Sequence, residues 1–275
     1  MRVVLYASLD GLVSRHLTVE YLHILRHHGG TKPMTFKVMS YNIENGGAGR
    51  LGMLGDIIRR QQPDAVALLE ATHKRPVEAL AHQLGMHLVY GEANSPEALA
   101  WLSRLPIVQS RNHRLPVLSK TLLEVAVRWS GSDVFLFVTH LIHGRTRASA
   151  GRREAEVQAI LDVLQVQRDT PHILVGDFNA IHPADPLGEP PIGETRGYFA
   201  RQPIQLLLAA GYTDCYRHLH RAMPGYTYPA AHPWMRLDYI FAAAPMAAQL
   251  YASDVDMGEH TRRASDHLPV WAAFR

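Results

Sequence analysis

Residues 172–180 of this 275-residue chain read His-Ile-Leu-Val-Gly-Asp-Phe-Asn-Ala. The first part of this stretch, His172–Val175, is an apolar run of the kind that forms a buried β-strand. Gly176, Asp177 and Asn179 follow at once, and such residues are common in turns. A carboxylate and an amide at the end of a buried strand are costly unless they face water, a cation or each other. The stretch therefore predicts a strand that ends in polar side chains at the edge of a sheet.

The same arrangement recurs at other strand ends of the chain. The polar residues at these positions are Asn42, Glu70, His140, Asp177, Asp238, Asp266 and His267. Each of them, taken alone, has an ordinary explanation as a turn, cap or surface residue. Turn chemistry gives no reason for so many groups that bind metals or protons to stand at the ends of apolar strands. We therefore expect these side chains to converge on one site.

Apolar periodicity divides the chain from residue 36 onward into strands and helices. We expect strands at Phe36–Tyr41, Ala65–Leu69, Leu122–Arg128, Val134–Thr139, His172–Val175, Tyr239–Phe241 and Leu268–Phe274. We expect helices at Leu51–Gln62, Pro76–Leu84, Thr146–Gln167 and Pro203–Ala210. The first part alternates strand and helix, whereas several later strands lack room for the crossovers that parallel pairing needs. This mixture indicates sheets covered by helices on their outer faces.

The composition is that of a globular protein, with 47% hydrophobic and 19% charged residues. It excludes a disordered tail, a collagen-like fibre and a coiled coil. The net charge of +3 is too small to indicate a nucleic-acid-binding protein by itself. The single cysteine, Cys215, excludes an intramolecular disulfide and a cysteine-based zinc site. Because no apolar run reaches the length of a membrane span, we expect a cytoplasmic protein.

The N-terminal part differs from the rest of the chain. Residues 12–28 carry apolar side chains at nearly helical spacing, and Gly29 and Gly30 end the pattern. Met34 then follows, and the sequence from Met34 onward could be the start of a protein by itself. We expect residues 1–33 to be a helical extension or an artefact of an upstream start codon, and residues 34–275 to form the domain. The N-terminus lacks the compact apolar block of a signal peptide.

The polar set at the strand ends is suited to metal-assisted phosphoryl transfer. Mg²⁺ prefers oxygen ligands and keeps several waters, so one or two carboxylates are enough to bind it. An imidazole polarised by a buried carboxylate can move a proton or stabilise charge on the phosphate. Asn179, beside Asp177, can hold the attacking water or a phosphate oxygen. The sequence therefore predicts a phosphoesterase with a Mg²⁺ cofactor, for which Mn²⁺ is a possible substitute.

These motifs, in this order, resemble the endonuclease/exonuclease/phosphatase superfamily. The resemblance is carried by Ser-Tyr-Asn-Ile at 40–43, Leu-Leu-Glu at 68–70, Thr-His-Leu at 139–141, Gly-Asp-Phe-Asn at 176–179, Leu-Asp-Tyr-Ile-Phe at 237–241 and Ser-Asp-His-Leu-Pro-Val at 265–270. It covers about residues 35–275. It implies an α/β fold with a four-layer α-β-β-α sandwich, in which two packed mixed β-sheets are flanked by helices.

The resemblance also implies a role for each matching residue. Asn42, Glu70 and Asp266 are similar to the family's metal-site residues, with Glu70 as the principal ligand. Asp177 resembles the residue that orients or activates water, and Asn179 resembles the one that binds the scissile phosphate. Asp238 and His267 resemble a carboxylate–imidazole pair in which Asp238 fixes the tautomer of His267. His140 is similar to a second histidine of the deoxyribonuclease I and sphingomyelinase branches, which disfavours an abasic-site repair enzyme.

Three further residues extend this implied site or depart from the family pattern. Glu124 is a candidate partner that would orient His140. Glu44 stands where the repair branch often has aspartate, so it is a possible second metal ligand. Leu99 stands near a position where the family usually has asparagine, which puts one substrate contact in doubt.

The substrate is the least determined feature. Arg262 and Arg263 lie just before Asp266 and could bind phosphate, and Trp234 is a candidate substrate contact. Arg145 and Arg147, which follow His140, are basic candidates to line a DNA-binding cleft, whereas Arg152 and Arg153 are expected on the solvated face of a helix. We predict a phosphodiesterase or endonuclease that acts on nucleic acid. The alternatives are a phosphatase or a sphingomyelinase-type phospholipid phosphodiesterase, or a binding module without activity.

Overall fold

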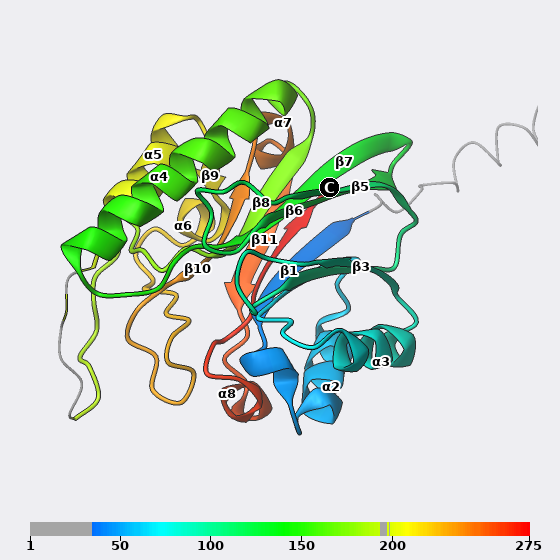
Figure 1. The fold of residues 1–275 in the computed structure, drawn as a ribbon, viewed down its shortest axis with the longest axis horizontal. Helices are drawn as coiled ribbons and strands as arrows, with labels where there is room; N and C mark the ends of the chain where they lie inside the picture. Colours follow the sequence, from blue (N-terminus) through cyan, green and yellow to red (C-terminus); the bar gives the residue numbers. More distant parts are fainter. Residues whose placement is uncertain (1–34, 193–196, 198) are drawn as a thin grey trace, which may run out of the picture. The chain divides into compact units, whose positions relative to one another are not determined.

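Two six-stranded β-sheets pack face to face in the computed structural model, which describes residues 35–192, 197 and 199–275 (Figure 1). The expected extension at residues 1–33 lies outside the described residues, so the division into 1–33 and 34–275 stays a prediction. No helix of the described part is long and apolar enough to cross a membrane.

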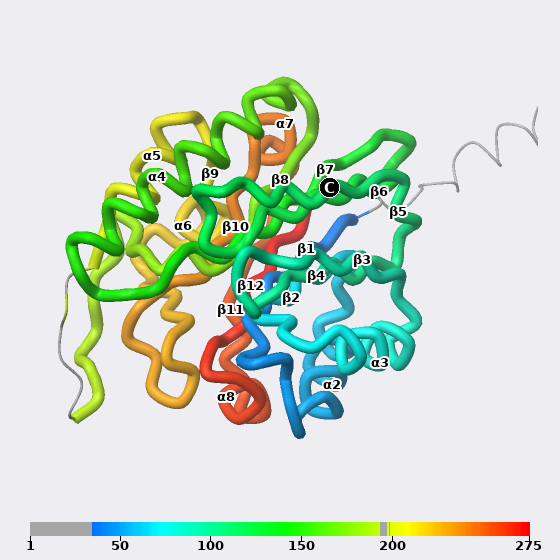
Figure 2. Tube along the Cα trace, in the orientation of Figure 1, coloured from blue at the N-terminus to red at the C-terminus, as the bar shows by residue number. Residues whose placement is uncertain are grey.

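The first sheet has its central strands near the two ends of the described chain. In spatial order it contains β11 (Leu250–Val255), β12 (Val270–Phe274), β1 (Phe36–Asn42), β2 (Ala65–Leu69), β4 (Leu99–Ser103) and β3 (His87–Gly91). Only β1 and β2 are parallel. Figure 2 shows β1 and β12, blue and red, side by side. Because Ser40 pairs with Val270, the chain that leads into Val270 runs beside the last residues of β1 and past its end.

The second sheet is built in the same way. In spatial order it contains β5 (Ile107–His113), β6 (Leu122–Trp129), β7 (Ser132–His140), β8 (His172–Asp177), β10 (Asp238–Ala242) and β9 (Thr213–Asp214). Its only parallel pair is β7 and β8, which are joined through helix α4 (Arg147–Leu164). A parallel pair needs such a crossover, and α4 provides it.

Helices cover the outer face of each sheet. Helices α2 (Leu51–Gln61) and α3 (Lys74–Leu84) pack on the first sheet, and α4 and α5 (Gln202–Ala209) pack on the second. The short elements are η1 (Asn45–Gly47), η2 (Gln165–Gln167), α6 (Cys215–Leu219), α7 (Ala244–Ala247) and α8 (Glu259–Ala264). A further apolar core, which includes Val38, Trp101, Val138 and Val175, lies between the sheets. The predicted four-layer α-β-β-α sandwich is confirmed.

Gly176 lies where β8 delivers Asp177, and its backbone has a φ of +152°. A Cβ atom there would stand 1.9 Å from the carbonyl oxygen of Thr139 on β7. Because that neighbour is backbone, it cannot turn aside as a side chain would. We expect Gly176→Ala to lower the free energy of unfolding by about 3 kcal/mol or more.

Urea denaturation followed by circular dichroism measures this loss. Gly151→Ala is the matched control, because Gly151 lies within α4 and a Cβ atom there meets nothing within 4 Å. We expect the control to gain about 0.5–1 kcal/mol. Equal stability of the two variants would contradict the prediction.

Candidate active site

The carboxyl ends of β1 and β2 and the segment before β12 place one group of polar residues at a single edge of the first sheet. Asn42 is the last residue of β1, and Glu70 comes directly after β2. Asp266 and His267 precede β12, which runs antiparallel to β1. Since the chain before β12 runs past the end of β1, both groups reach the same edge.

The second sheet places its polar residues at a matching edge. His140 ends β7, Asp177 ends β8, and Asp238 begins β10. The parallel register pairs His140 with Asp177, and the antiparallel register pairs Asp238 with Asp177. Hydrogen bonding between the strands therefore fixes these three residues side by side.

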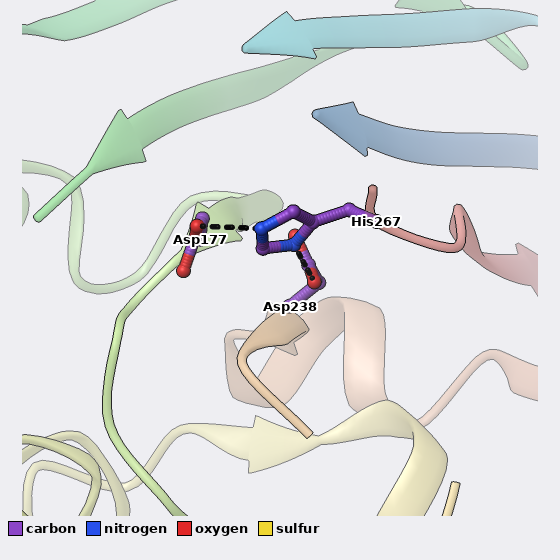
Figure 3. Close-up of side chains that lie close together, drawn as sticks. All are labelled: Asp177, Asp238 and His267. Carbon is purple, nitrogen blue, oxygen red and sulfur yellow. Dashed lines mark hydrogen bonds and ion pairs between the residues drawn. The ribbon is translucent and has the colours of Figure 1, made fainter. Parts of the chain in front are cut away.

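Asp177, Asp238 and His267 form a buried cluster at this edge (Figure 3). Nδ1 of His267 donates a hydrogen bond to Oδ2 of Asp238 at 2.8 Å, and its Nε2 lies 3.7 Å from Oδ2 of Asp177. Nε2 of His140 lies 3.5 Å from the same Asp177 oxygen. The hydrogen bond to Asp238 fixes the orientation of the His267 ring, so that Nε2 faces Asp177.

Burial and neighbouring charges shift the pKa values of this cluster. Burial raises the pKa of Asp177 to about 7, with His267 opposing the shift and Asp238 adding to it. Burial lowers the pKa of His267, but the carboxylates of Asp238 and Asp177 outweigh it and raise that pKa to about 10. Burial, helped by the charge of Lys120, lowers the pKa of His140 well below its usual value. At neutral pH the imidazole of His267 is thus charged and that of His140 is neutral.

Glu70 and Asp266 form the acidic side of the site. Glu70 accepts hydrogen bonds from Nδ2 of Asn42 at 3.1 Å and from the backbone N–H of Asn45 at 3.0 Å. Burial raises the pKa of Asp266; the charge of His267 opposes that shift, and the nearby carboxylates of Glu44 and Glu70 add to it. Carboxylates that crowd in this way fit a hard divalent cation, because it relieves their repulsion with the oxygen ligands that it prefers.

These residues open into one cavity of about 340 Å³. Of the expected site residues, it is lined by Glu70, His140, Asp177, Asn179, Asp266 and His267. Asn42 contributes through its hydrogen bond to Glu70, and Asp238 through its hydrogen bond to His267. Asn179 is held by its own amide, which donates to the carbonyl of Leu141 at 3.1 Å. The arrangement can bind a cation, orient a water and stabilise negative charge within this one cavity.

Some residues singled out in the sequence lie away from the cavity. Trp234 is buried and packs edge-on against Phe199, with ring centroids 5.6 Å apart. Arg262 and Arg263 lie on α8, and neither lines the cavity. Trp234 does not line the cavity, and the proposed substrate contacts of Trp234 and of the two arginines stay predictions.

Two expectations outside the main set are wrong. Glu124 does not orient His140, because it accepts a hydrogen bond at 2.7 Å from Nε2 of His113. Arg153 is fully buried rather than solvated, and its Nη1 donates to the carbonyls of Ile142 and Gly144 at 2.8 and 3.0 Å. Arg153 thus holds the loop that follows His140.

The cavity has further lining residues that the sequence motifs do not mark. They include Glu97, His143, Phe199 and Tyr228, and the cavity is also lined by Arg145, one of the basic candidates from the sequence. The stretch Thr-His-Leu-Ile-His-Gly-Arg places His143 between His140 and Arg145, which is a signal that could have identified it. Nothing in the sequence around Glu97 or Tyr228 marks either residue, because they come from loops whose course depends on the folded chain.

Comparison with known proteins relates this site to a family. Residues 39–267 match the model of the endonuclease/exonuclease/phosphatase family. A 3′ phosphatase from Neisseria, solved with a product DNA hairpin, is 26% identical with a TM-score of 0.72, and the alignment covers 87% of this chain and 99% of that one. An AP endonuclease from Archaeoglobus fulgidus is 22% identical with a TM-score of 0.73 and the same coverage. Comparison with curated proteins gives no match.

Proposed function

Because the chain belongs to the endonuclease/exonuclease/phosphatase family and is a hydrolase of phosphate esters, we propose that it is a Mg²⁺-dependent phosphodiesterase that cuts nucleic acid. One observation carries the proposal. A single cavity brings the acidic pair Glu70 and Asp266 together with Asp177, Asn179 and His267. A phosphodiester bound there would meet a cation, a proton acceptor and a hydrogen-bond donor at once.

Each residue has a definite part in the proposed reaction. Glu70 and Asp266, with Asn42 beside them, would hold Mg²⁺, which supplies Lewis-acid stabilisation of charge on the phosphate when bound. Asp177 in its carboxylate form would accept a proton from the attacking water. His267, held as an imidazolium between Asp238 and Asp177, would donate Nε2–H to a phosphate oxygen. Asn179 would position the phosphate against both groups.

One neighbouring enzyme, solved in two structures, supports a nucleic-acid substrate. The Neisseria 3′ phosphatase, which was solved with DNA, is 26% identical to this chain. The second structure of this enzyme, described as a 3′–5′ exonuclease from Neisseria meningitidis, is 25% identical with a TM-score of 0.71. The first of these also favours a second candidate function, the removal of a terminal phosphate from DNA. Placement in the deoxyribonuclease I and sphingomyelinase branch rests on His140, and it stays a prediction together with the cytoplasmic location.

Nicking of supercoiled plasmid tests the proposal. We expect the wild-type protein to nick the plasmid with Mg²⁺ and to stop when a chelator is added, and we expect His267→Ala to be inactive under both conditions. Release of phosphate from a 3′-phosphorylated DNA hairpin, without nicking, would replace the proposed activity with the phosphatase activity. Hydrolysis of detergent-dispersed sphingomyelin alone would contradict both and would favour the phospholipid substrate.

The proposed proton acceptor predicts a pH dependence. Burial raises the pKa of Asp177 to about 7, and its protonated form cannot accept a proton from water. We therefore expect kcat/KM to fall about tenfold per pH unit below pH 7 and to level off above it. Measurement at saturating Mg²⁺ between about pH 5 and pH 9 checks this. A rate that does not change over that range would contradict the role of Asp177.

A further inference from the structure

Arg50 joins two segments that lie far apart in the sequence and meet at the acidic side of the site. Its Nη1 donates to Oε2 of Glu44 at 2.5 Å and to the carbonyl of Ala264 at 2.8 Å. Its Nη2 donates to the carbonyls of Glu44 and Ile43 at 2.6 and 3.3 Å. The guanidinium thus donates hydrogen bonds both to the turn after Asn42 and to the residue that precedes Ser265.

Glu44 would be a candidate cation ligand if its carboxylate were free. It stands two residues after Asn42, and its backbone N–H donates to Oδ1 of Asn42 at 3.1 Å. Its negative charge reaches Asp266, whose pKa it helps to raise. Yet Glu44 does not line the cavity that Glu70 and Asp266 line. Its carboxylate instead forms the ion pair with Arg50, in which the Glu44 side chain is 38% exposed.

The same arginine fixes the spacing of the two acidic segments. The carbonyl of Ala264 that it binds lies two residues before Asp266. The hydroxyl of Ser265 donates to the carbonyl of Asn42 at 2.7 Å and ties the same two segments a second time. An arginine has five donors in a rigid fork, so it can hold a carboxylate and several carbonyls in one geometry.

We propose that Arg50 is a positioning residue that holds Glu44 out of the metal site, so that one divalent cation binds through Glu70 and Asp266, with Asn42 beside them. The proposal rests on the cation dependence of the proposed function. Recruitment of Glu44 to the cation would require its carboxylate to leave Arg50, whose guanidinium would then stand unpaired beside the site. Charge-assisted hydrogen bonds of this kind are among the strongest in proteins, which keeps Glu44 where it is.

Binding of Mn²⁺ to the full chain without substrate tests the proposal, with free Mn²⁺ followed by electron paramagnetic resonance. We expect one equivalent in the wild type. Glu44→Gln removes a nearby negative charge but no ligand, so it should weaken binding less than about fourfold, whereas Glu70→Gln should weaken binding at least about tenfold. In Arg50→Met the carboxylate of Glu44 is released. The double variant Arg50→Met/Glu44→Gln lacks this carboxylate. We therefore expect Arg50→Met to bind Mn²⁺ at least about fivefold more tightly than the double variant.

Arg50→Lys is the conservative variant, because it keeps a cation beside Glu44, and we expect it to bind Mn²⁺ like the wild type. Glu44→Gln tests the proposal even where an Arg50 variant does not fold. If Glu44→Gln weakens binding as much as Glu70→Gln, Glu44 is a ligand and the proposal is overturned while the proposed function stands. Equal binding by Arg50→Met and the double variant would also overturn it. If Glu70→Gln has no effect, the metal site of the proposed function fails as well.

Discussion

His267→Ala is expected to lower kcat by about two to four orders of magnitude, with a much smaller effect on KM. The side chain is the buried imidazolium that Asp238 orients and that faces Asp177 across 3.7 Å. Its removal takes away the donor that meets charge as it develops on the phosphate, and it leaves two buried carboxylates without a counter-charge. Since each tenfold loss corresponds to ~1.4 kcal/mol, the barrier rises by roughly 3–6 kcal/mol.

Steady-state kinetics on a phosphodiester substrate, with circular dichroism to show that the variant folds, measures this loss. His87→Ala is the matched control, because His87 is exposed at the start of β3 and lines no part of the cavity. We expect the control to keep the wild-type kcat. Unchanged turnover in a folded His267→Ala protein would remove His267 from the proposed mechanism.

The second large effect is expected at the acidic side of the site. Glu70→Ala should raise the Mg²⁺ concentration that gives half-maximal activity at least about 100-fold, because even partners outside the ligand shell are worth 10–100-fold in metal affinity. The variant removes the carboxylate that Asn42 and the backbone of Asn45 hold in place. High Mg²⁺ should restore part of the activity, since the proton-transfer residues remain.

Activity measured against Mg²⁺ concentration gives the half-maximal value directly. Glu78→Ala is a suitable control, because Glu78 lies on α3, is exposed and pairs only weakly with Lys74 at 3.6 Å. The control should leave the Mg²⁺ dependence unchanged. If Glu70→Ala and the wild type reach half-maximal activity at the same Mg²⁺ concentration, Glu70 is not a metal ligand.

The sequence was most informative where strands are buried on both faces. Ala65–Leu69 is β2 without a change at either end, and each of the other predicted strands overlaps one β-strand whose bounds differ by a few residues. The missed strands β3, β5, β9 and β11 are at the edges of the sheets, where the apolar pattern is short or is interrupted by polar residues. Strand β4 is buried, but a run of five mainly apolar residues fits a helix as well as a strand.

The polar residues of the site were predictable because strand ends and register bring them together, and both follow from local pattern. Asp177 and Asp238 are opposite each other in the β8–β10 ladder. Residues of the loops were not predictable in this way. Trp234 is buried, and Glu124 pairs with His113 rather than His140, because tertiary packing decides which way such side chains point. The chemical roles of all site residues stay predictions until the variants are measured.

The division of the site between two sheets has an evolutionary consequence. Glu70 and His267 come from the first sheet, whereas Asp177 and Asp238 come from the second, and the apolar core around Val38 and Val175 sets the separation of the sheets. Protein interiors are packed densely enough for a change of one methylene group to be felt. Substitutions in this core therefore alter the spacing of the reacting groups as well as stability. Selection for turnover should slow the divergence of this core relative to the outer helices, although none of its residues lines the cavity.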